Sequence, residues 1–160
     1  WTFYNTPQLM ENFAKGMKER NIGIEFECYD IGHIWNVLRM YEREVIDEND
    51  LHFNIVMGIG GGMPPTLQNL HHAINMLPDK AHKCAMAPSR HEFPICALGA
   101  ILGTNVRVGL EDNVYITKGE LSQGNRPIVA KMKRILNDMG FQLEGSTEAR
   151  DILNIPFIHK

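Results

Sequence analysis

The sequence predicts an α/β fold that is the C-terminal half of a (β/α)8 TIM barrel, with parallel strands and a short extra helix at the C-terminus. Short apolar segments of strand length alternate with longer segments in which apolar residues recur at helical spacing. Strands that alternate with helices pair in parallel through right-handed crossover connections. The strand–helix units number half of those in a barrel, and a doubly wound open sheet built from the same units remains the structural alternative.

Capping residues and periodicity place each element along the chain. Thr6 and Pro7 begin the first helix, because threonine is an N-cap residue and proline suits the first helical position. Thr66 caps the third helix, and Gly140 closes the helix that follows the last strand. In order, the expected elements are a helix over 7–20, a strand over 24–28, a helix over 34–45, a strand over 52–57, a helix over 67–77, a strand over 82–87, a helix over 93–102, a strand over 105–110, a helix over 127–139 and a helix over 146–153.

The composition is that of a globular protein. Hydrophobic residues make up 44% and charged residues 22%, and the net charge of −3 arises from interleaved acidic and basic residues. The sequence has no basic stripe of the kind that nucleic-acid backbones require, and no apolar run long enough to cross a membrane. Cys28, Cys84 and Cys96 show no metal-binding or redox spacing, which indicates reduced thiols in a cytoplasmic protein.

The length of the chain bounds its domain organisation. With 160 residues it has the length of one ordinary domain, and it contains no linker or low-complexity tract. We therefore interpret residues 1–160 as a single partial domain, the second half of a barrel that typically has about 250 residues. The chain opens with Trp1 and enters a helix almost at once. These features predict that the functional protein is longer and that this segment has two open sheet edges.

The last strand and the residues after it carry the candidate chemistry. Alternate residues over 105–110 are valine or leucine and would pack against helices. Arg107 and Glu111 share the opposite face, and Asp112 follows at the C-terminal end, where barrel enzymes place their chemistry. A buried charge is costly unless it is paired or coordinated. These side chains could therefore supply an orienting cation, a metal ligand and a general base, with a structural ion-pair cluster as the alternative.

Three other features suggest weaker candidates. Glu27 lies near the active end of the first strand, where a carboxylate needs a metal or a cationic substrate as a partner, whereas Glu25 falls at the solvated start of that strand. The loop over 58–62 lacks the third glycine of a dinucleotide-binding fingerprint, so a substrate-lining loop or a tight turn is expected there. His33 and His91 follow strands but have no partner at ligand spacing, so we expect hydrogen-bonded structural histidines.

Four segments, taken in chain order, resemble those of one enzyme family. The most specific covers residues 107–115, RVGLEDNVY, followed by Lys118 and Gly119. It resembles the hallmark segment of the β-keto acid cleavage enzymes, which include 3-keto-5-aminohexanoate cleavage enzymes. The resemblance covers nearly the whole chain, and the other segments are 25–33 (EFECYDIGH), 58–64 (GIGGGMP) and 146–153 (STEARDIL).

The resemblance implies a zinc-dependent enzyme in which a β-keto acid reacts with acetyl-CoA to give acetoacetate and a new acyl-CoA. It implies that Glu111 is a metal ligand together with a His-x-His pair from an early strand. It implies that Asp112 is the base that deprotonates the keto acid, with Arg107 orienting and supporting it. Glu27 would contact a substrate amino group in members that act on amino-keto acids. The resemblance also implies a homo-oligomer.

One departure from the family pattern affects the metal site. No His-x-His sequence occurs in the 160 residues, so this segment alone should lack a complete zinc site. The loop over 87–92 is a smaller departure, because the family more often has a glycine-rich segment there. Two other functions stay open: a non-catalytic half-barrel that binds a partner, and another metal-dependent barrel lyase or aldolase that uses the same Glu111.

Overall fold

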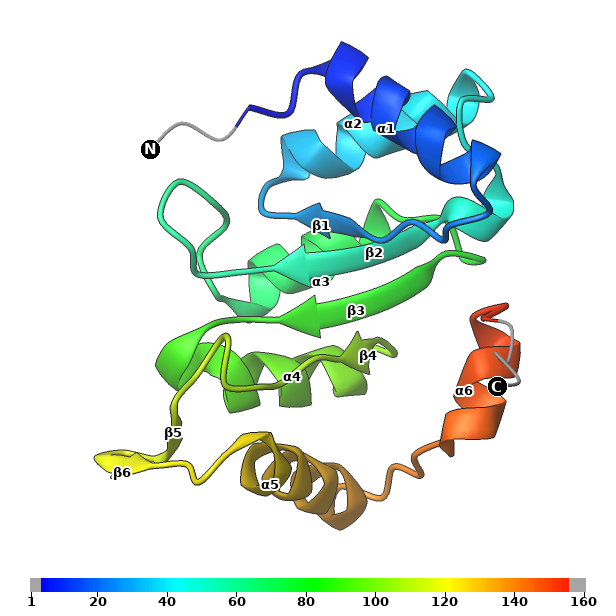
Figure 1. The fold of residues 1–160 in the computed structure, drawn as a ribbon. Helices are drawn as coiled ribbons and strands as arrows, with labels where there is room; N and C mark the ends of the chain where they lie inside the picture. The colour runs from blue at the N-terminus through cyan, green and yellow to red at the C-terminus, as the bar shows by residue number, and fades with distance from the viewer. Residues whose placement is uncertain (1–3, 156–160) are drawn as a thin grey trace.

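A four-stranded parallel sheet in the order β1-β2-β3-β4 forms the centre of the computed structural model, which describes residues 4–155 (Figure 1). The strand order follows the chain order without the reversal that defines a doubly wound sheet. Consecutive neighbouring strands joined through helices are the arrangement of a barrel wall, so the predicted α/β half-barrel is confirmed. The strands are β1 (Phe26–Cys28), β2 (His52–Val56), β3 (His82–Met86) and β4 (Asn105–Val106).

The helices form where the apolar periodicity predicts them. Thr6 and Thr66 accept backbone N–H groups at the starts of α1 and α3, and Asp30 does the same for α2. Two single-turn 3-10 helices, Glu48–Asp50 and Ser89–His91, precede β2 and α4. The helices are α1 (Pro7–Glu19), α2 (Ile31–Glu42), α3 (Leu67–Asn75), α4 (Glu92–Ile101), α5 (Asn125–Asp138) and α6 (Ser146–Ile152).

The last strand is shorter than the sequence predicts. β4 ends at Val106, so the prediction of a strand through residue 110 is wrong. The N–H groups of Gly109 and Leu110 bond to side chains, those of Glu92 and Asn125, instead of to a neighbouring strand. Sequence patterns also did not predict the hairpin that follows, formed by β5 (Tyr115–Thr117) and β6 (Glu120–Leu121).

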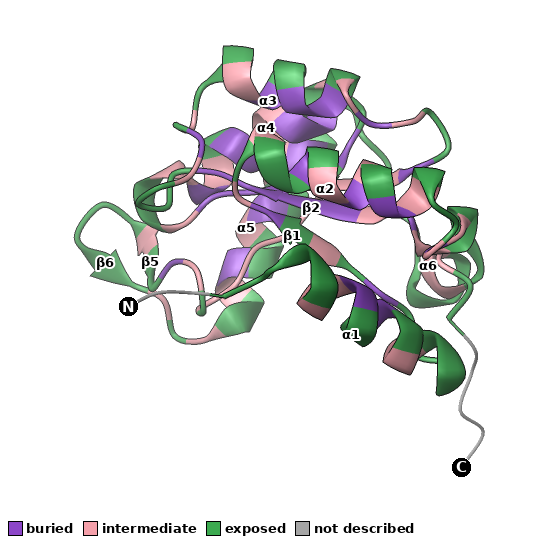
Figure 2. Cartoon of the chain, turned by 90° about the horizontal axis from the view of Figure 1, so that it is seen from above, coloured by how far each residue is buried: buried purple, intermediate pink, exposed green. Residues whose placement is uncertain are grey.

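The main core lies between one face of the sheet and its helices, and a smaller cluster joins α4 and α5. Phe53 and Ile55 of β2 are buried on the helical face. Figure 2 shows the buried segments along the strands and the inward sides of the helices, with exposed residues on the outer helix faces. No helix within residues 4–155 is long and apolar enough to cross a membrane.

The other face of the sheet would line the interior of a closed barrel, and it is notably polar. Register pairs Glu27 of β1 with Asn54 of β2, and Asn54 with Cys84 of β3. Because paired residues of parallel strands project to the same side, these side chains form a row across this face. At the carboxyl ends of the strands, this row lies next to the predicted site residues.

Candidate active site

Arg107 joins the predicted site residues into one cluster at the carboxyl end of the sheet. Its Nη1 lies 2.6 Å from Glu27 Oε1, and its Nη2 lies 2.8 Å from Glu111 Oε2. Its Nε lies 3.6 Å from Asp112 Oδ2. Three carboxylates from two distant parts of the chain therefore surround one guanidinium.

The surroundings of Glu27 favour its ionised form. The Tyr29 hydroxyl donates a 2.5 Å hydrogen bond to Glu27 Oε2, while Arg107 donates to the other oxygen. The bond from Tyr29, followed by the interactions with Arg107, lowers the pKa of Glu27 although partial burial opposes this. Conversely, burial and the Glu27 carboxylate raise the pKa of Tyr29 to about 12. Tyr29 therefore stays a neutral donor and Glu27 an acceptor with negative charge.

Asp112 lies in a different environment, although it belongs to the same cluster. Its side chain is 12% exposed, whereas that of Glu111 is 81% exposed. Burial raises the pKa of Asp112, Arg107 partly offsets this, and the nearby charges of Glu111 and Glu27 raise it further. A sheltered carboxylate with a raised pKa is a stronger base than a free aspartate, as general-base chemistry requires.

A buried carboxylate, Glu92, fixes the segment that carries this cluster. Glu92 is fully buried at the start of α4 and accepts hydrogen bonds from the Gly109 N–H at 2.8 Å and from Asn113 Nδ2 at 2.9 Å. The Asn113 amide also bonds to both backbone groups of Tyr115. Glu92 was not predicted from the sequence. Its one available signal was a charged residue at the start of an otherwise apolar helix.

The glycine-rich loop after β2 packs against the residue that holds Glu27. The Met63 N–H donates to the Tyr29 carbonyl at 2.7 Å, and a Cβ at Gly62 would lie 2.6 Å from the same carbonyl oxygen. The loop over 58–62 is therefore a turn whose backbone passes close to Tyr29, beside the cluster. A glycine is required at position 62 because a larger side chain would collide with the Tyr29 carbonyl.

We expect Gly62→Ala to lower the free energy of unfolding by about 1–3 kcal/mol, because overpacking displaces backbone. Gly60→Ala is the matched control, since a Cβ there meets nothing within 4 Å. Urea unfolding of both variants measures the difference. Equal stability of the two variants would show that the loop moves freely away from Tyr29.

Glu111, the predicted metal ligand, lies on the solvent-facing side of this cluster. Glu111 presents a solvent-facing carboxylate next to Asp112, with one oxygen bonded to Arg107. Among residues 4–155, however, no group of three or more His, Cys, Asp or Glu side chains is arranged to hold a metal ion. The described residues therefore do not by themselves form a metal site.

The predicted structural histidines and the cysteines are not members of this cluster, although the Cys96 thiol donates to the carbonyl oxygen of Arg107 at 3.2 Å. His33 accepts the Tyr29 N–H, and His91 pairs with the neighbouring Arg90 side chain. All three cysteines are free thiols, and burial raises the pKa of the Cys84 thiol to about 12. Within the described part of the chain, none of these histidines and cysteines belongs to a group of side chains that could hold a metal ion.

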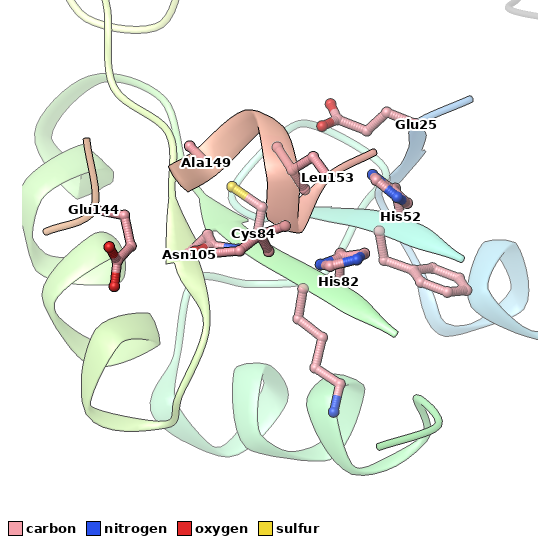
Figure 3. A pocket seen from close by; sticks show the side chains of 11 residues that line it. Glu25, His52, His82, Cys84, Asn105, Glu144, Ala149 and Leu153 are labelled. Atoms are coloured by element: carbon pink, nitrogen blue, oxygen red, sulfur yellow. The ribbon is translucent and has the colours of Figure 1, made fainter. Parts of the chain in front are cut away.

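A pocket of about 250 Å³ lies at the opposite end of the strands. The rings of His52 and His82, from the starts of β2 and β3, lie with their centroids 4.5 Å apart and their planes tilted by 53°. Figure 3 shows these imidazoles side by side, with Ala149 of α6 and Leu153, the residue after that helix, lining the same pocket. Because barrel enzymes place catalytic groups at the carboxyl ends of strands, this pocket is not the candidate active site.

Comparison with known proteins supplies the family. Residues 1–155 match the sequence model of the beta-keto acid cleavage enzymes. The chain belongs to this family.

Curated members of the β-keto acid cleavage enzyme family align over nearly the whole chain. The 3-keto-5-aminohexanoate cleavage enzyme of Acetoanaerobium sticklandii is 36% identical over 153 residues, which are 96% of this chain and 56% of the relative. The enzyme of the same name from Fusobacterium nucleatum is 33% identical, over 96% of this chain and 55% of the relative. The 3-dehydrocarnitine:acetyl-CoA trimethylamine transferase of Rhizobium meliloti is 32% identical, over 94% of this chain and 50% of the relative. The chain thus spans about half the length of these relatives.

Proposed function

We propose that this chain forms part of the active site of a metal-dependent enzyme that reacts a β-keto acid with acetyl-CoA, giving acetoacetate and a new acyl-CoA. The observation that carries the proposal is the sheltered Asp112 beside the Arg107 guanidinium, at the carboxyl end of the strands. A positioned base next to a fixed cation suits removal of a proton from carbon with stabilisation of the resulting negative charge.

In the proposed reaction, Asp112 accepts a proton from the carbon between the keto and carboxylate groups of the substrate. That carbon then attacks the acetyl carbonyl carbon of acetyl-CoA, whose C–S bond breaks and releases the coenzyme A thiolate. The thiolate attacks the original keto carbon, and the bond between that carbon and the former nucleophilic carbon breaks, which leaves the new acyl-CoA. The proton held by Asp112 returns to the released carbon and completes acetoacetate. Arg107, which already pairs with three carboxylates, would bind the substrate carboxylate and support the charge that develops beside Asp112.

Glu111 is the proposed metal ligand of this chain. A carboxylate oxygen is a suitable zinc ligand, and the exposed side chain is accessible to an ion. A bound divalent cation would polarise the keto oxygen of the substrate. The remaining ligands, a His-x-His pair in the family pattern, would have to come from residues outside this sequence, because the sequence contains no such pair.

Glu27 is proposed to favour keto acids that carry a cationic group. Its pKa is lowered, so the carboxylate is negatively charged at neutral pH, and the hydrogen bond from Tyr29 fixes its orientation. The names of the relatives above include an amino group and a trimethylamine group. Other relatives act, by their names, on 3,5-dioxohexanoate and 3-oxoadipate, which lack an amine. A substrate panel therefore needs both kinds.

The experiment incubates the natural gene product with zinc, acetyl-CoA and this panel, and detects new CoA thioesters by mass spectrometry. Formation of acetoacetate together with a new acyl-CoA supports the proposal, with the amino-substituted acids expected to react fastest. Cleavage that does not need acetyl-CoA would favour a lyase or aldolase instead. No reaction with any acid by folded, zinc-supplied protein would favour a non-catalytic role. Size-exclusion chromatography and cell fractionation test the accompanying proposal of a cytoplasmic homo-oligomer.

We expect Glu111→Ala to abolish metal-dependent turnover and to lower zinc affinity strongly. Loss of a residue that only hydrogen-bonds to a metal ligand costs roughly 10–100-fold in affinity, and loss of the ligand itself should cost more. Stability should be nearly unchanged, because the side chain is largely exposed. Metal analysis after dialysis measures the loss, and Glu42→Ala, at another exposed glutamate on α2, is the control. Wild-type zinc content in Glu111→Ala would exclude the ligand role.

A further inference from the structure

Asn54 is a fully buried amide without a hydrogen-bond partner. It lies in the middle of β2, has no exposed surface, and neither its Nδ2 nor its Oδ1 has a partner in the described structure. The neighbouring residues Phe53 and Ile55 are apolar and face the helices. A polar side chain that is buried without a partner costs about 1–3 kcal/mol, so its presence calls for a reason.

The ion pair between Glu27 and Arg107 spans the strand that carries Asn54. Glu27 belongs to β1 and Arg107 follows β4, so the 2.6 Å contact between them crosses the two intervening strands. Asn54 lies between them, in register with Glu27 on one side and Cys84 on the other. The contact between the two long side chains therefore spans the strand that carries the buried amide.

The Asn54 amide lies near the Glu27 carboxylate without bonding to it. It contributes to lowering the pKa of Glu27, but it is outside hydrogen-bonding geometry while Arg107 and Tyr29 occupy the two carboxylate oxygens. Glu27 would lose the cation that it pairs with if a substrate carboxylate drew Arg107 away. An amide N–H in the adjacent register position is the group that could replace it.

We propose that Asn54 is a positioning residue that receives the Glu27 carboxylate when an anionic keto acid engages Arg107. This inference rests on the proposed function, since it takes the ligand of Arg107 to be the substrate carboxylate. Without substrate, Glu27 pairs with Arg107 and the Asn54 amide has no partner. With substrate bound to Arg107, Glu27 accepts a hydrogen bond from the Asn54 amide. Asn54 thereby lowers the cost of separating Glu27 from Arg107 and keeps Glu27 aimed into the site.

The first test replaces Asn54 by leucine, which has the same branching and number of side-chain atoms. Removing an unpartnered buried amide should raise Tm by about 2–6 °C. The KM for the keto acid should rise by about tenfold, with the KM for acetyl-CoA unchanged. Asn105→Leu is the control, because it makes the same change at an exposed position of β4. A fall in Tm with unchanged KM values would show that Asn54 has only a structural role.

The second test needs no substrate. Arg107→Met removes the competing partner, so Glu27 should then bond to Asn54. The Glu27 titration is followed by carbon NMR in Arg107→Met with and without Asn54→Leu. The added substitution should raise the Glu27 midpoint by about one pH unit in that background, and far less in the wild-type background. An equal effect in both backgrounds would overturn the inference, even if no keto acid is turned over and the proposed function itself fails.

Discussion

Replacing Asp112 by asparagine is expected to lower kcat by about 10²–10⁴-fold, because an amide cannot accept the proton that a general base removes. The replacement keeps the size of the side chain and one acceptor oxygen near Arg107. The KM for the keto acid should change much less than kcat, since Arg107 and Glu27 remain. Steady-state kinetics with the best acid of the panel measure both constants.

The raised pKa of Asp112 predicts how both activity and stability depend on pH. Activity should fall as pH drops through this pKa, at a pH above that of an ordinary aspartate, since the protonated form cannot act as a base. A carboxyl group whose folded pKa is raised stabilises the fold only at low pH, and this contribution is lost as pH rises through the folded pKa. At neutral pH, Asp112→Asn should therefore be at least as stable as the wild type.

Asp79→Asn provides the control for this substitution, because Asp79 is exposed. It should change neither kcat nor Tm by a measurable amount. An Asp112→Asn variant that retains more than about a tenth of wild-type kcat would remove the residue from the role of base. Loss of activity accompanied by a large fall in Tm would point instead to a structural ion-pair cluster.

Replacing Glu92 by alanine is expected to reduce the free energy of unfolding by about 3–5 kcal/mol. The substitution leaves the Gly109 N–H and the Asn113 amide buried without their acceptor, and it opens a cavity at the start of α4. Glutamine cannot substitute fully, because it has one acceptor oxygen, and its NH₂ group would face either the Gly109 N–H or the Asn113 amide nitrogen. Chemical denaturation of both variants measures these losses.

Activity should fall with the Glu92 substitutions at temperatures where the protein is still folded, since Arg107 and Asp112 lie on the segment that Glu92 fixes. Glu11→Ala is the control, because Glu11 is another nearly buried carboxylate, paired with Arg43. It should cost stability without changing kcat. Equal effects of the two substitutions on kcat would show that loss of stability alone explains the Glu92 variants.

The elements that the sequence predicted correctly depend on local patterns. Helix caps at Thr6 and Thr66 and the apolar periodicities act within a few residues, and the structure confirms them. The end of β4 depends on contacts from Glu92 and Asn125, which lie 17 and 15 residues away from the groups they bind. A strand pattern over 105–110 carries no information about such acceptors, so the predicted strand was too long.

The candidate site was predictable in its location and less so in its partners. The rule that parallel strands end at one edge brought Glu27 and Arg107 together, 80 residues apart in the chain. Tyr29 was not predicted, because its bond to Glu27 depends on how the chain turns after β1. Asn54 was not predicted either, because an amide within a strand gives no local sign of an ion pair between residues of two other segments.

The most direct test of the account is the position of zinc in a crystal of the natural gene product. Anomalous scattering at the zinc edge should place the ion about 2.0–2.2 Å from a Glu111 carboxylate oxygen, next to Asp112 and Arg107. Glu111 should then have released Arg107. Zinc bound elsewhere, with Glu111 still paired to Arg107, would contradict the assignment of this cluster as a metal-dependent active site.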